Sequence, residues 1–295
     1  MKTCIICNPG AGSVDDREKI QHQLEAFTGA RIEFSGEPGE ANRLAHAAAE
    51  AGFECIIAAG GDGTLNEVVN GIAGFSDRVQ LGLIPLGTGN DFAKMLDLPA
   101  GVEACIETLR AGNVRAIDVV RVTSDQTRFM VNVSAGGFSG AVNEKLTPEI
   151  KASWGPLAYV RCAAEALPEL RAYSTEITLD DATTFTESLY NVVIANGRYV
   201  AGGTMIAPEA SIEDGLLDIV LVPENSATDL ALVAAQIAVG RHLTSEGVIF
   251  RRAGKVSVHS TPGMWFNVDG ELIGNEPTTF EVLPRALRFL AGEKT

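Results

Sequence analysis

Hydrophobic and polar positions alternate in two different ways along this chain. Up to about Val122, short apolar runs such as Thr3–Cys7, Phe53–Ala59 and Leu81–Ile84 are separated by amphipathic stretches. Continuous apolar runs are typical of strands that are buried on both faces of a parallel sheet. The amphipathic stretches predict helices that cover this sheet, at Arg17–Phe27, Glu40–Ala51 and Val102–Ala111.

Strand patterns dominate after Val122. Helices are predicted only near Leu157–Leu167 and Ala227–Val239. Many short strands separated by turn residues are typical of an antiparallel sandwich or partial barrel. The predicted strands are Phe129–Ser134, Thr175–Leu179, Leu189–Ala195, Leu217–Val222, Lys255–His259, Met264–Val268 and Thr279–Leu283. The sequence therefore predicts an α/β domain followed by a β-rich domain.

Three predicted strands of the first part end in a glycine-rich loop that leads into a helix. The loops are NPGAGS after Thr3–Cys7, GGDGTLNE after Phe53–Ala59 and PLGTGND after Leu81–Ile84. Glycine amides can approach an anion closely, and a helix N-terminus favours negative charge. Ligands of open α/β sheets bind beyond the carboxyl ends of the strands. We therefore expect the loops to form one phosphate-binding site for a nucleotide.

The central loop also carries a carboxylate, Asp62. A carboxylate beside a phosphate is repelled unless a divalent cation lies between them, so Asp62 is assigned to Mg²⁺. Stabilisation of a turn is the alternative role. Thr64 and Glu67 have the spacing of a capping box, and capping alone would explain both residues. The helix after the third loop is predicted to be capped by Asn90 or Asp91.

Common nucleotide-binding and zinc motifs are absent from the sequence. It has no GxxxxGK[ST] loop, no HExxH, and no GxGxxG with a suitably spaced acid. The nucleotide site is therefore expected to differ from P-loop and Rossmann sites.

The chain resembles the diacylglycerol kinase-type lipid kinases, a family that includes bacterial soluble diacylglycerol kinases and the sphingosine and ceramide kinases. The resemblance covers nearly the whole chain and is most specific at GGDGTLNE (60–67), PLGTGNDFA (85–93), NGRYVAGGTMIAPEASIEDGLLDI (196–219) and DGE (269–271). NAD kinases and phosphofructokinases share only GGDGT. The resemblance implies an NAD kinase- and phosphofructokinase-like α/β domain with a parallel sheet, a mainly antiparallel β-sandwich, and an ATP site in the cleft between them.

The resemblance also implies roles for matching residues. Asp62 and Asp91 would organise the phosphates and the catalytic Mg²⁺, and Glu271 would be the general base on the lipid hydroxyl. A metal site, in part through backbone carbonyls, would consist of Ser211, Asp214 and Leu216. The residues that would line ATP are Asn8, Pro9, Gly10, Ala11, Gly12, Ser35, Gly60, Gly61, Asp62, Gly63, Thr64, Leu65, Asn66, Glu67 and Thr88.

Glu271 follows an Asp-Gly turn after the predicted strand Met264–Val268, so a hairpin would hold its carboxylate rigidly. Phosphoryl transfer requires positioning, charge neutralisation and a carboxylate for the attacking hydroxyl. The position of Glu271 after the turn is explained equally well if it is an ordinary exposed glutamate of a hairpin. The position of Asp214 is likewise explained by a plain turn. Only the resemblance assigns chemistry to these two residues.

Three positions differ from the family pattern. Glu213 stands where aspartate is common, Ala11 where NPxSG members have serine, and Ser35 where many members have threonine. Ala11 would remove one phosphate hydrogen bond, whereas Ser35 keeps the hydroxyl.

Composition limits the partners. A formal net charge of −15 argues against nucleic acid, which requires a positive surface, and disfavours anionic membrane leaflets. Arg251, Arg252 and Lys255 could form a basic face, although an ordinary solvated face explains them equally well. The stretch LALVAAQIAV is far shorter than the ~20 apolar residues that cross a bilayer. We expect a soluble or peripheral protein.

Five cysteines and the lack of a secretory segment indicate a reducing cytoplasm. Cys4 and Cys7 are predicted to point to opposite faces of one strand as core residues, so neither zinc nor a disulfide is favoured. The histidines have no ligand spacing and are predicted to be surface or capping groups; they are His22, His46, His242 and His259.

We therefore predict a nucleotide-binding domain over residues 1–123 with a C-terminal return over 285–295, and a β-rich lipid-substrate domain over 124–284. The predicted protein is a cytoplasmic ATP- and Mg²⁺-dependent kinase that phosphorylates a diacylglycerol-like lipid at the inner membrane face. The alternatives are a kinase for a sphingoid lipid or for a soluble alcohol such as NAD, and a non-catalytic nucleotide- or lipid-binding regulator. The sequence leaves a homodimer open.

Overall fold

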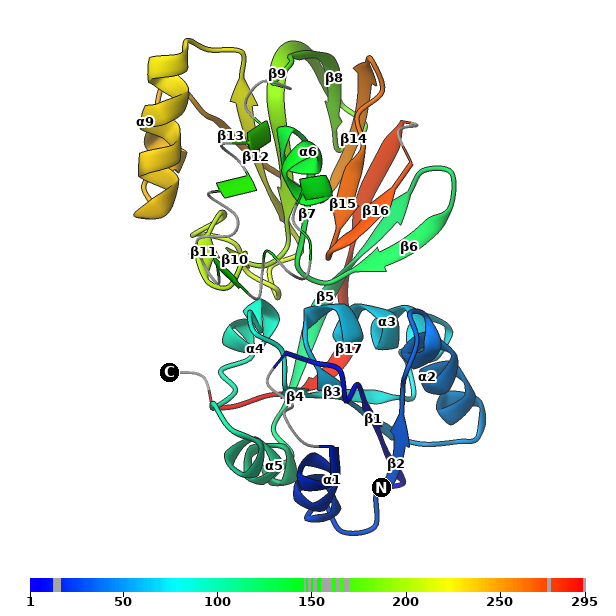
Figure 1. Cartoon of the computed structure of the whole chain (residues 1–295). Coiled ribbons are helices and arrows are strands. Elements are labelled where there is room, and N and C mark those ends of the chain that lie inside the picture. The colour runs from blue at the N-terminus through cyan, green and yellow to red at the C-terminus, as the bar shows by residue number, and fades with distance from the viewer. Residues whose placement is uncertain are drawn as a thin grey trace. The chain divides into compact units, whose positions relative to one another are not determined.

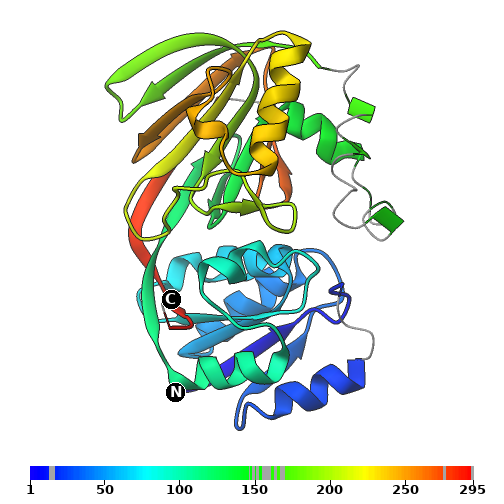
Figure 2. The same ribbon diagram turned by 90° about the vertical axis from the view of Figure 1, so that its left-hand side faces the viewer.

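The computed structural model of the protein describes residues 1–12, 17–145, 147, 150, 153–154, 161–162, 165–166, 170–274 and 277–293 (Figure 1 and Figure 2). The chain forms two compact units, Met1–Val119 with Leu283–Thr295, and Val120–Val282. Two long strands, β5 (Val114–Thr123) and β17 (Thr278–Leu290), run from one unit into the other. Each unit has its own hydrophobic core.

The first unit is built on a parallel sheet with the strand order β17-β4-β3-β1-β2. Besides the C-terminal part of β17, its strands are β1 (Thr3–Cys7), β2 (Arg31–Phe34), β3 (Cys55–Gly60) and β4 (Gln80–Pro85). Every residue of β1 and β3 is buried, as the continuous apolar runs predict. The C-terminal segment ALRFL therefore returns to the first unit, where Phe289 pairs with Leu81.

Helices cover both faces of this sheet (Figure 1). On one face, Ile5 and Ile57 pack against Leu24 and Leu109 of α1 and α5. On the other face, α2 and α3 pack together. The helices are α1 (Arg17–Glu25), α2 (Glu40–Glu50), α3 (Asp62–Ile72), α4 (Asp91–Met95) and α5 (Val102–Ala111), with a 3-10 turn η1 (Ala73–Phe75).

Cys4 and Cys7 are buried and free, which confirms that they are core residues. Cys7 packs in the core on the α1 side of the sheet, and burial raises the pKa of both thiols to about 11.

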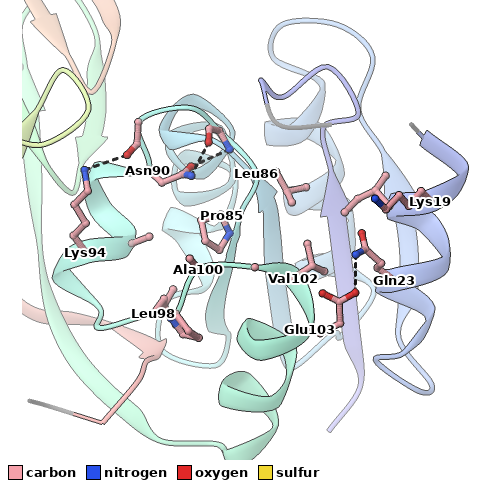
Figure 3. A pocket seen from close by; sticks show the side chains of 16 residues that line it. Lys19, Gln23, Pro85, Leu86, Asn90, Lys94, Leu98, Ala100, Val102 and Glu103 are labelled. Atoms are coloured by element: carbon pink, nitrogen blue, oxygen red, sulfur yellow. Dashed lines mark hydrogen bonds between the residues drawn. The ribbon is translucent and has the colours of Figure 1, made fainter. Parts of the chain in front are cut away.

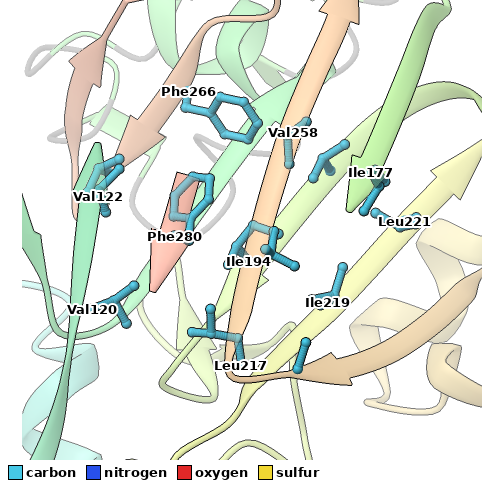
Figure 4. Packing of buried hydrophobic residues seen from close by; sticks show 14 of the residues in the cluster. Val120, Val122, Ile177, Ile194, Leu217, Ile219, Leu221, Val258, Phe266 and Phe280 are labelled. Carbon is cyan, nitrogen blue, oxygen red and sulfur yellow. The ribbon is translucent and has the colours of Figure 1, made fainter. Parts of the chain in front are cut away.

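The second unit is an antiparallel β structure in which β16, β15, β7, β9, β8, β14 and β17 follow one another. Its core contains Phe266 and Phe280, whose rings meet edge to face at 5.4 Å (Figure 4). The strands that lie wholly within this unit are β6 (Thr127–Met130), β7 (Val133–Gly137), β8 (Tyr173–Leu179), β9 (Thr183–Ala195), β10 (Tyr199–Val200), β11 (Thr204–Met205), β12 (Leu217–Pro223), β13 (Ile249–Ala253), β14 (Lys255–Thr261), β15 (Phe266–Val268) and β16 (Glu271–Ile273). The described helices are α6 (Phe138–Lys145), α9 (Ala227–Ala238) and η4 (His242–Thr244).

Three strand predictions are wrong in their extent. The predicted strand Leu189–Ala195 begins earlier, at Thr183, as β9. The predicted strand Phe129–Ser134 is two strands, because the chain turns between β6 and β7. The predicted strand Thr279–Leu283 continues through Pro284 as β17. There Arg285 has a φ of 52°, and its N–H donates to Asp118 Oδ1 at 2.7 Å.

The predicted helix Leu157–Leu167 lies largely outside the described residues, and so does the segment WGPLAYV apart from the exposed Trp154. No helix in the part of the chain that the structure describes is long and apolar enough to span a membrane.

Candidate functional site

The three glycine-rich loops of the first unit meet at one edge of its sheet. β1, β3 and β4 are neighbouring parallel strands, so their carboxyl ends lie together. The N–H of Asn8 donates to the carbonyl of Ala59 at 2.9 Å, and the N–H of Leu86 donates to the carbonyl of Gly60 at 2.9 Å. Ser35 joins the same edge from β2, because its N–H donates to the carbonyl of Cys7 at 2.9 Å.

Glycine is required where these loops touch. A Cβ on Gly87 would lie 2.6 Å from Cα of Gly61, and a Cβ on Gly12 would overlap the Thr88 hydroxyl. The side chain of Asn8 reaches the Thr64 hydroxyl at 3.4 Å. The loops therefore pack backbone against backbone. Glycines at these contacts have no side chain that would keep an anion away from the backbone.

Asp62 links the second and third loops. Its carboxylate accepts hydrogen bonds from the N–H groups of Asp91 and Phe92, both at 3.1 Å, and so caps α4. Burial raises the pKa of the Asp62 carboxyl above its ordinary value; the two amide bonds oppose this rise, and the nearby Asp91 adds to it. Asp91 is also buried and binds Lys94 at 2.9 Å. A half-buried and a buried carboxylate thus lie close together beside the glycine loops.

The predicted capping box is wrong. α3 begins at Asp62 with Gly61 at the N-cap position, so Thr64 lies inside the first turn. The carboxylate of Glu67 instead accepts hydrogen bonds from the N–H groups of Gly39 and Ala41, both at 3.0 Å, at the start of α2. Glu67 therefore caps a neighbouring helix and not its own.

The predicted start of α4 is correct, but the predicted capping side chain is not. Asn90 stands at the N-cap position, but its side chain makes no capping hydrogen bond. It binds the backbone N–H and carbonyl of Gly87 at 2.9 and 2.6 Å instead. The capping bonds come from Asp62, which is distant in sequence.

Not every residue of the predicted ATP set offers its side chain. Leu65 and Asn66 are buried within α3, and the N–H of Leu65 donates to the carbonyl of Gly61 at 3.1 Å. In the first loop, Gly10 donates its N–H to Asn8 Oδ1 at 2.9 Å. Pro9 and Ala11 beside it are half-buried, while Gly63 has open space around its Cα.

A cavity of about 570 Å³ lies behind the third loop, between α1, α4 and the segment that leads into α5 (Figure 3). Its walls include Leu86, Leu98 and Val102, and Gln23 and Glu103 close one side through a 2.7 Å hydrogen bond. The described lining contains none of the residues predicted to contact ATP. The cavity nevertheless shares the third loop, because Pro85, Gly87 and Asn90 line it.

In the second unit, Glu271 follows the predicted hairpin turn. Asp269 and Gly270 both have positive φ values, 46° and 98°, as the tight turns of two-residue hairpins require. Glu271 is the first residue of β16, and its Oε2 accepts a hydrogen bond from Arg128 Nη1. Sequence reasoning missed Arg128, because a single arginine in a strand has no spacing signal.

The predicted metal segment lies before β12. One carboxylate oxygen of Asp214 accepts the N–H of Leu216 at 3.1 Å, and the other binds the guanidinium of Arg252. The Ser211 hydroxyl accepts the N–H of Glu213 at 3.3 Å. No group of three or more His, Cys, Asp or Glu residues that could hold a metal ion occurs among the described residues. Arg252 is a cation that faces Asp214.

The suggested basic face is largely neutralised. Arg252 also binds the buried Asp218 at 2.7 Å, and Lys255 binds Asp181 at 2.7 Å. The prediction for the histidines is wrong for His242, which is fully buried. Its Nε2 lies 2.8 Å from the carbonyl of Ile206, and burial lowers its pKa.

Two family models match the chain. The diacylglycerol kinase catalytic domain matches residues 2–122, and the YegS C-terminal NAD kinase beta sandwich-like domain matches residues 131–291. The diacylglycerol kinase of Bacillus subtilis (strain 168) is 34% identical over 287 residues, which cover 95% of this chain and 93% of that protein. That of Staphylococcus saprophyticus is 32% identical over 280 residues, 94% of this chain and 90% of that protein.

Solved structures have the same fold. A diacylglycerol kinase structure from Bacillus anthracis has a TM-score of 0.74 at 21% identity, with 99% of this chain and 97% of that chain covered. An NAD kinase from Archaeoglobus fulgidus in complex with ATP has a TM-score of 0.55 at 15% identity, with 100% and 95% covered. The protein thus has an NAD kinase-like fold, with a parallel α/β unit and an antiparallel β-sandwich-like unit. The match to the family models and the identity to these relatives show that the chain belongs to the diacylglycerol kinase family. The chain is therefore a kinase of the lipid-kinase type.

Proposed function

We propose that this kinase transfers the γ-phosphate of ATP, with Mg²⁺, to a hydroxyl of a diacylglycerol-like lipid. The observation that carries the proposal is the convergence of three glycine loops on two carboxylates, the half-buried Asp62 and the buried Asp91. The curated relatives, named diacylglycerol kinases, support the choice of lipid. The ATP bound to the Archaeoglobus fulgidus NAD kinase supports the choice of nucleotide.

The loops suit a nucleotide triphosphate. Gly10, Gly12 and Gly61 have no side chain in the way of a phosphate, and Thr88 adds a hydroxyl at the same edge. Phosphates bind well to exposed amides at loop and helix N-termini. Ser35 follows β2 at this edge and supplies a further hydroxyl.

Asp62 and Asp91 suit Mg²⁺. Mg²⁺ is usually held by one or two carboxylates together with substrate phosphates and water. These carboxylates lie close enough for Asp91 to raise the pKa of Asp62, which the positive charge of Lys94 partly offsets. The metal ion would neutralise negative charge on the transferring phosphoryl group.

Glu271 would accept the proton of the lipid hydroxyl. Arg128 binds Oε2 of this glutamate, and Oε1 has no hydrogen-bond partner in the described part of the chain. A positioned carboxylate of this kind contributes a factor of about 10² to 10⁴ in rate as a general base.

The test is Glu271→Gln, assayed by phosphate transfer to dispersed diacylglycerol. We expect kcat to fall about 10²- to 10⁴-fold while ATP binding, measured by calorimetry, is retained. Glu281→Gln is the matched control, because Glu281 also pairs with an arginine, Arg121, at similar exposure. Unchanged turnover in Glu271→Gln would remove the base assignment, and an absence of turnover in the unmodified protein would favour the non-catalytic regulator.

A further inference from the structure

We propose that Arg128 is a positioning residue for Glu271, which holds the carboxylate in the orientation that general-base catalysis requires. This inference rests on the proposed function. Arg128 lies on β6 and Glu271 on β16, 143 residues apart in sequence. Their side chains are 33% and 40% exposed, so the pair is partly withdrawn from solvent.

The backbones of both residues are tied together by one carboxylate. Asp269 accepts hydrogen bonds from the N–H groups of Val131, Asn132 and Val133, at 2.7, 3.1 and 2.9 Å. These amides form the turn that directly follows the strand of Arg128, and Asp269 is in the hairpin turn that precedes Glu271. The arginine and the glutamate therefore project from two segments that are locked to each other. Catalytic groups need support of this kind to hold their geometry.

The hydrogen bond leaves one carboxylate oxygen for the substrate. Arg128 Nη1 binds Oε2, and Oε1 makes no hydrogen bond within the residues described. A guanidinium is planar and rigid, so one of its N–H groups fixes the rotation of a carboxylate better than the flexible ammonium of lysine. The pair thus restrains the glutamate without occupying both of its acceptors.

The placement of Arg128 lowers the stability of the fold. Its Nε is buried and has no hydrogen-bond partner within the described part of the chain. A buried donor without a partner disfavours folding, and such groups in native structures require an explanation, for example a catalytic role. The ion pair alone gives little structural reason for this arrangement, because pairs that remain about a third or more exposed contribute little to stability.

Arg121 and Glu281 provide an internal comparison. They form an ion pair of the same type at 2.6 Å in the same unit, with side chains 43% and 38% exposed. Neither belongs to the proposed catalytic residues. Removal of Arg121 therefore controls for the loss of a half-buried arginine and its ion pair.

The experiment measures kcat and the KM for ATP in Arg128→Met, Arg128→Lys and Arg121→Met, each also combined with Glu271→Gln. We expect Arg128→Met to lower kcat about 10- to 100-fold, as supporting residues of catalytic groups do, with little change in the KM for ATP. Arg128→Lys should recover part of kcat, and Arg121→Met should retain it. In the Glu271→Gln background, Arg128→Met should cause no further loss, because residues that act as a unit are not additive.

The outcomes separate the two proposals. If Glu271→Gln abolishes turnover but Arg128→Met retains it, the positioning role is wrong and the proposed function stands. An equal loss from Arg128→Met in both backgrounds also overturns it, since Arg128 would then act independently of Glu271. If Glu271→Gln keeps full turnover, the base assignment itself fails. Should Arg128→Met not fold, judged by its thermal unfolding, Arg128→Gln retains hydrogen-bond donors without the charge and decides the same question.

Discussion

Carboxylates in this protein stabilise backbone groups that lie far away in the sequence. Asp62 binds the first amides of α4, 29 and 30 residues on, and Asp269 binds the turn after β6, some 137 residues back. Each such carboxylate satisfies N–H groups that would otherwise be left without a partner. The same bonds fix the position of a residue to which we assign chemistry.

The pH dependence of stability tests the environment of Asp62. Because burial raises its pKa in the folded protein, the ionised carboxylate is less favourable in the folded state than in the unfolded chain. The contribution of Asp62 to the free energy of unfolding therefore falls as the pH rises. The fall begins below the ordinary pKa of 3.8 and continues through the raised pKa of the folded state.

We thus expect the unfolding free energy of the wild type, relative to Asp62→Asn, to decrease from acidic to neutral pH, with kinase activity lost in the variant. Urea unfolding of both proteins over this range measures the difference. A difference that rises with pH would mean that the amide bonds outweigh burial and that the pKa is lowered.

At the level of single elements, the sequence predicts most of the first unit. The bounds of β1 and α5 agree with the predicted ranges Thr3–Cys7 and Val102–Ala111, because continuous apolar runs and helical spacing are local signals. The turn between β6 and β7 is different. It is held by Asp269, so the strand pattern from Phe129 to Ser134 contains nothing that marks it.

The candidate site shows the same limit. The sequence predicts the three loops, the hairpin of Glu271 and the position of Asp62, because glycine clusters and Asp-Gly turns are local features, whereas the role of Asp91 comes from the family resemblance. It does not predict that Glu67 caps α2, or that Arg128 meets Glu271, because each contact joins two elements. For Glu67 the local capping-box pattern even indicates the wrong partner.

The cap on α2 gives a prediction of its own. Gly39 stands at the N-cap position and has no side chain, so Glu67 supplies the acceptor for the first turn. We expect Glu67→Ala to lower the unfolding free energy by about 1 kcal/mol, as the loss of a helix cap does. Glu50→Ala, which removes an exposed glutamate from the last turn of the same helix, should cost less than about 0.5 kcal/mol. Chemical unfolding compares the variants, and equal losses would contradict the capping role.

At the scale of the whole molecule, two units of different construction agree with the family assignment. The parallel unit and the antiparallel unit correspond to the two family models that match residues 2–122 and 131–291. The acidic charge of −15 persists as a constraint on lipid binding, since Arg252 and Lys255 are already paired with carboxylates. Of the predicted basic face, Arg252 and Lys255 therefore carry little uncompensated positive charge.

The most direct test of lipid kinase function is the transfer of ³²P from γ-labelled ATP, with Mg²⁺, to a panel of acceptors. The panel contains detergent-dispersed diacylglycerol, a sphingoid base, and soluble alcohols that include NAD. We predict label in the organic phase with diacylglycerol as the preferred acceptor, and its loss when Mg²⁺ is chelated. Label found only on a water-soluble acceptor would contradict the account.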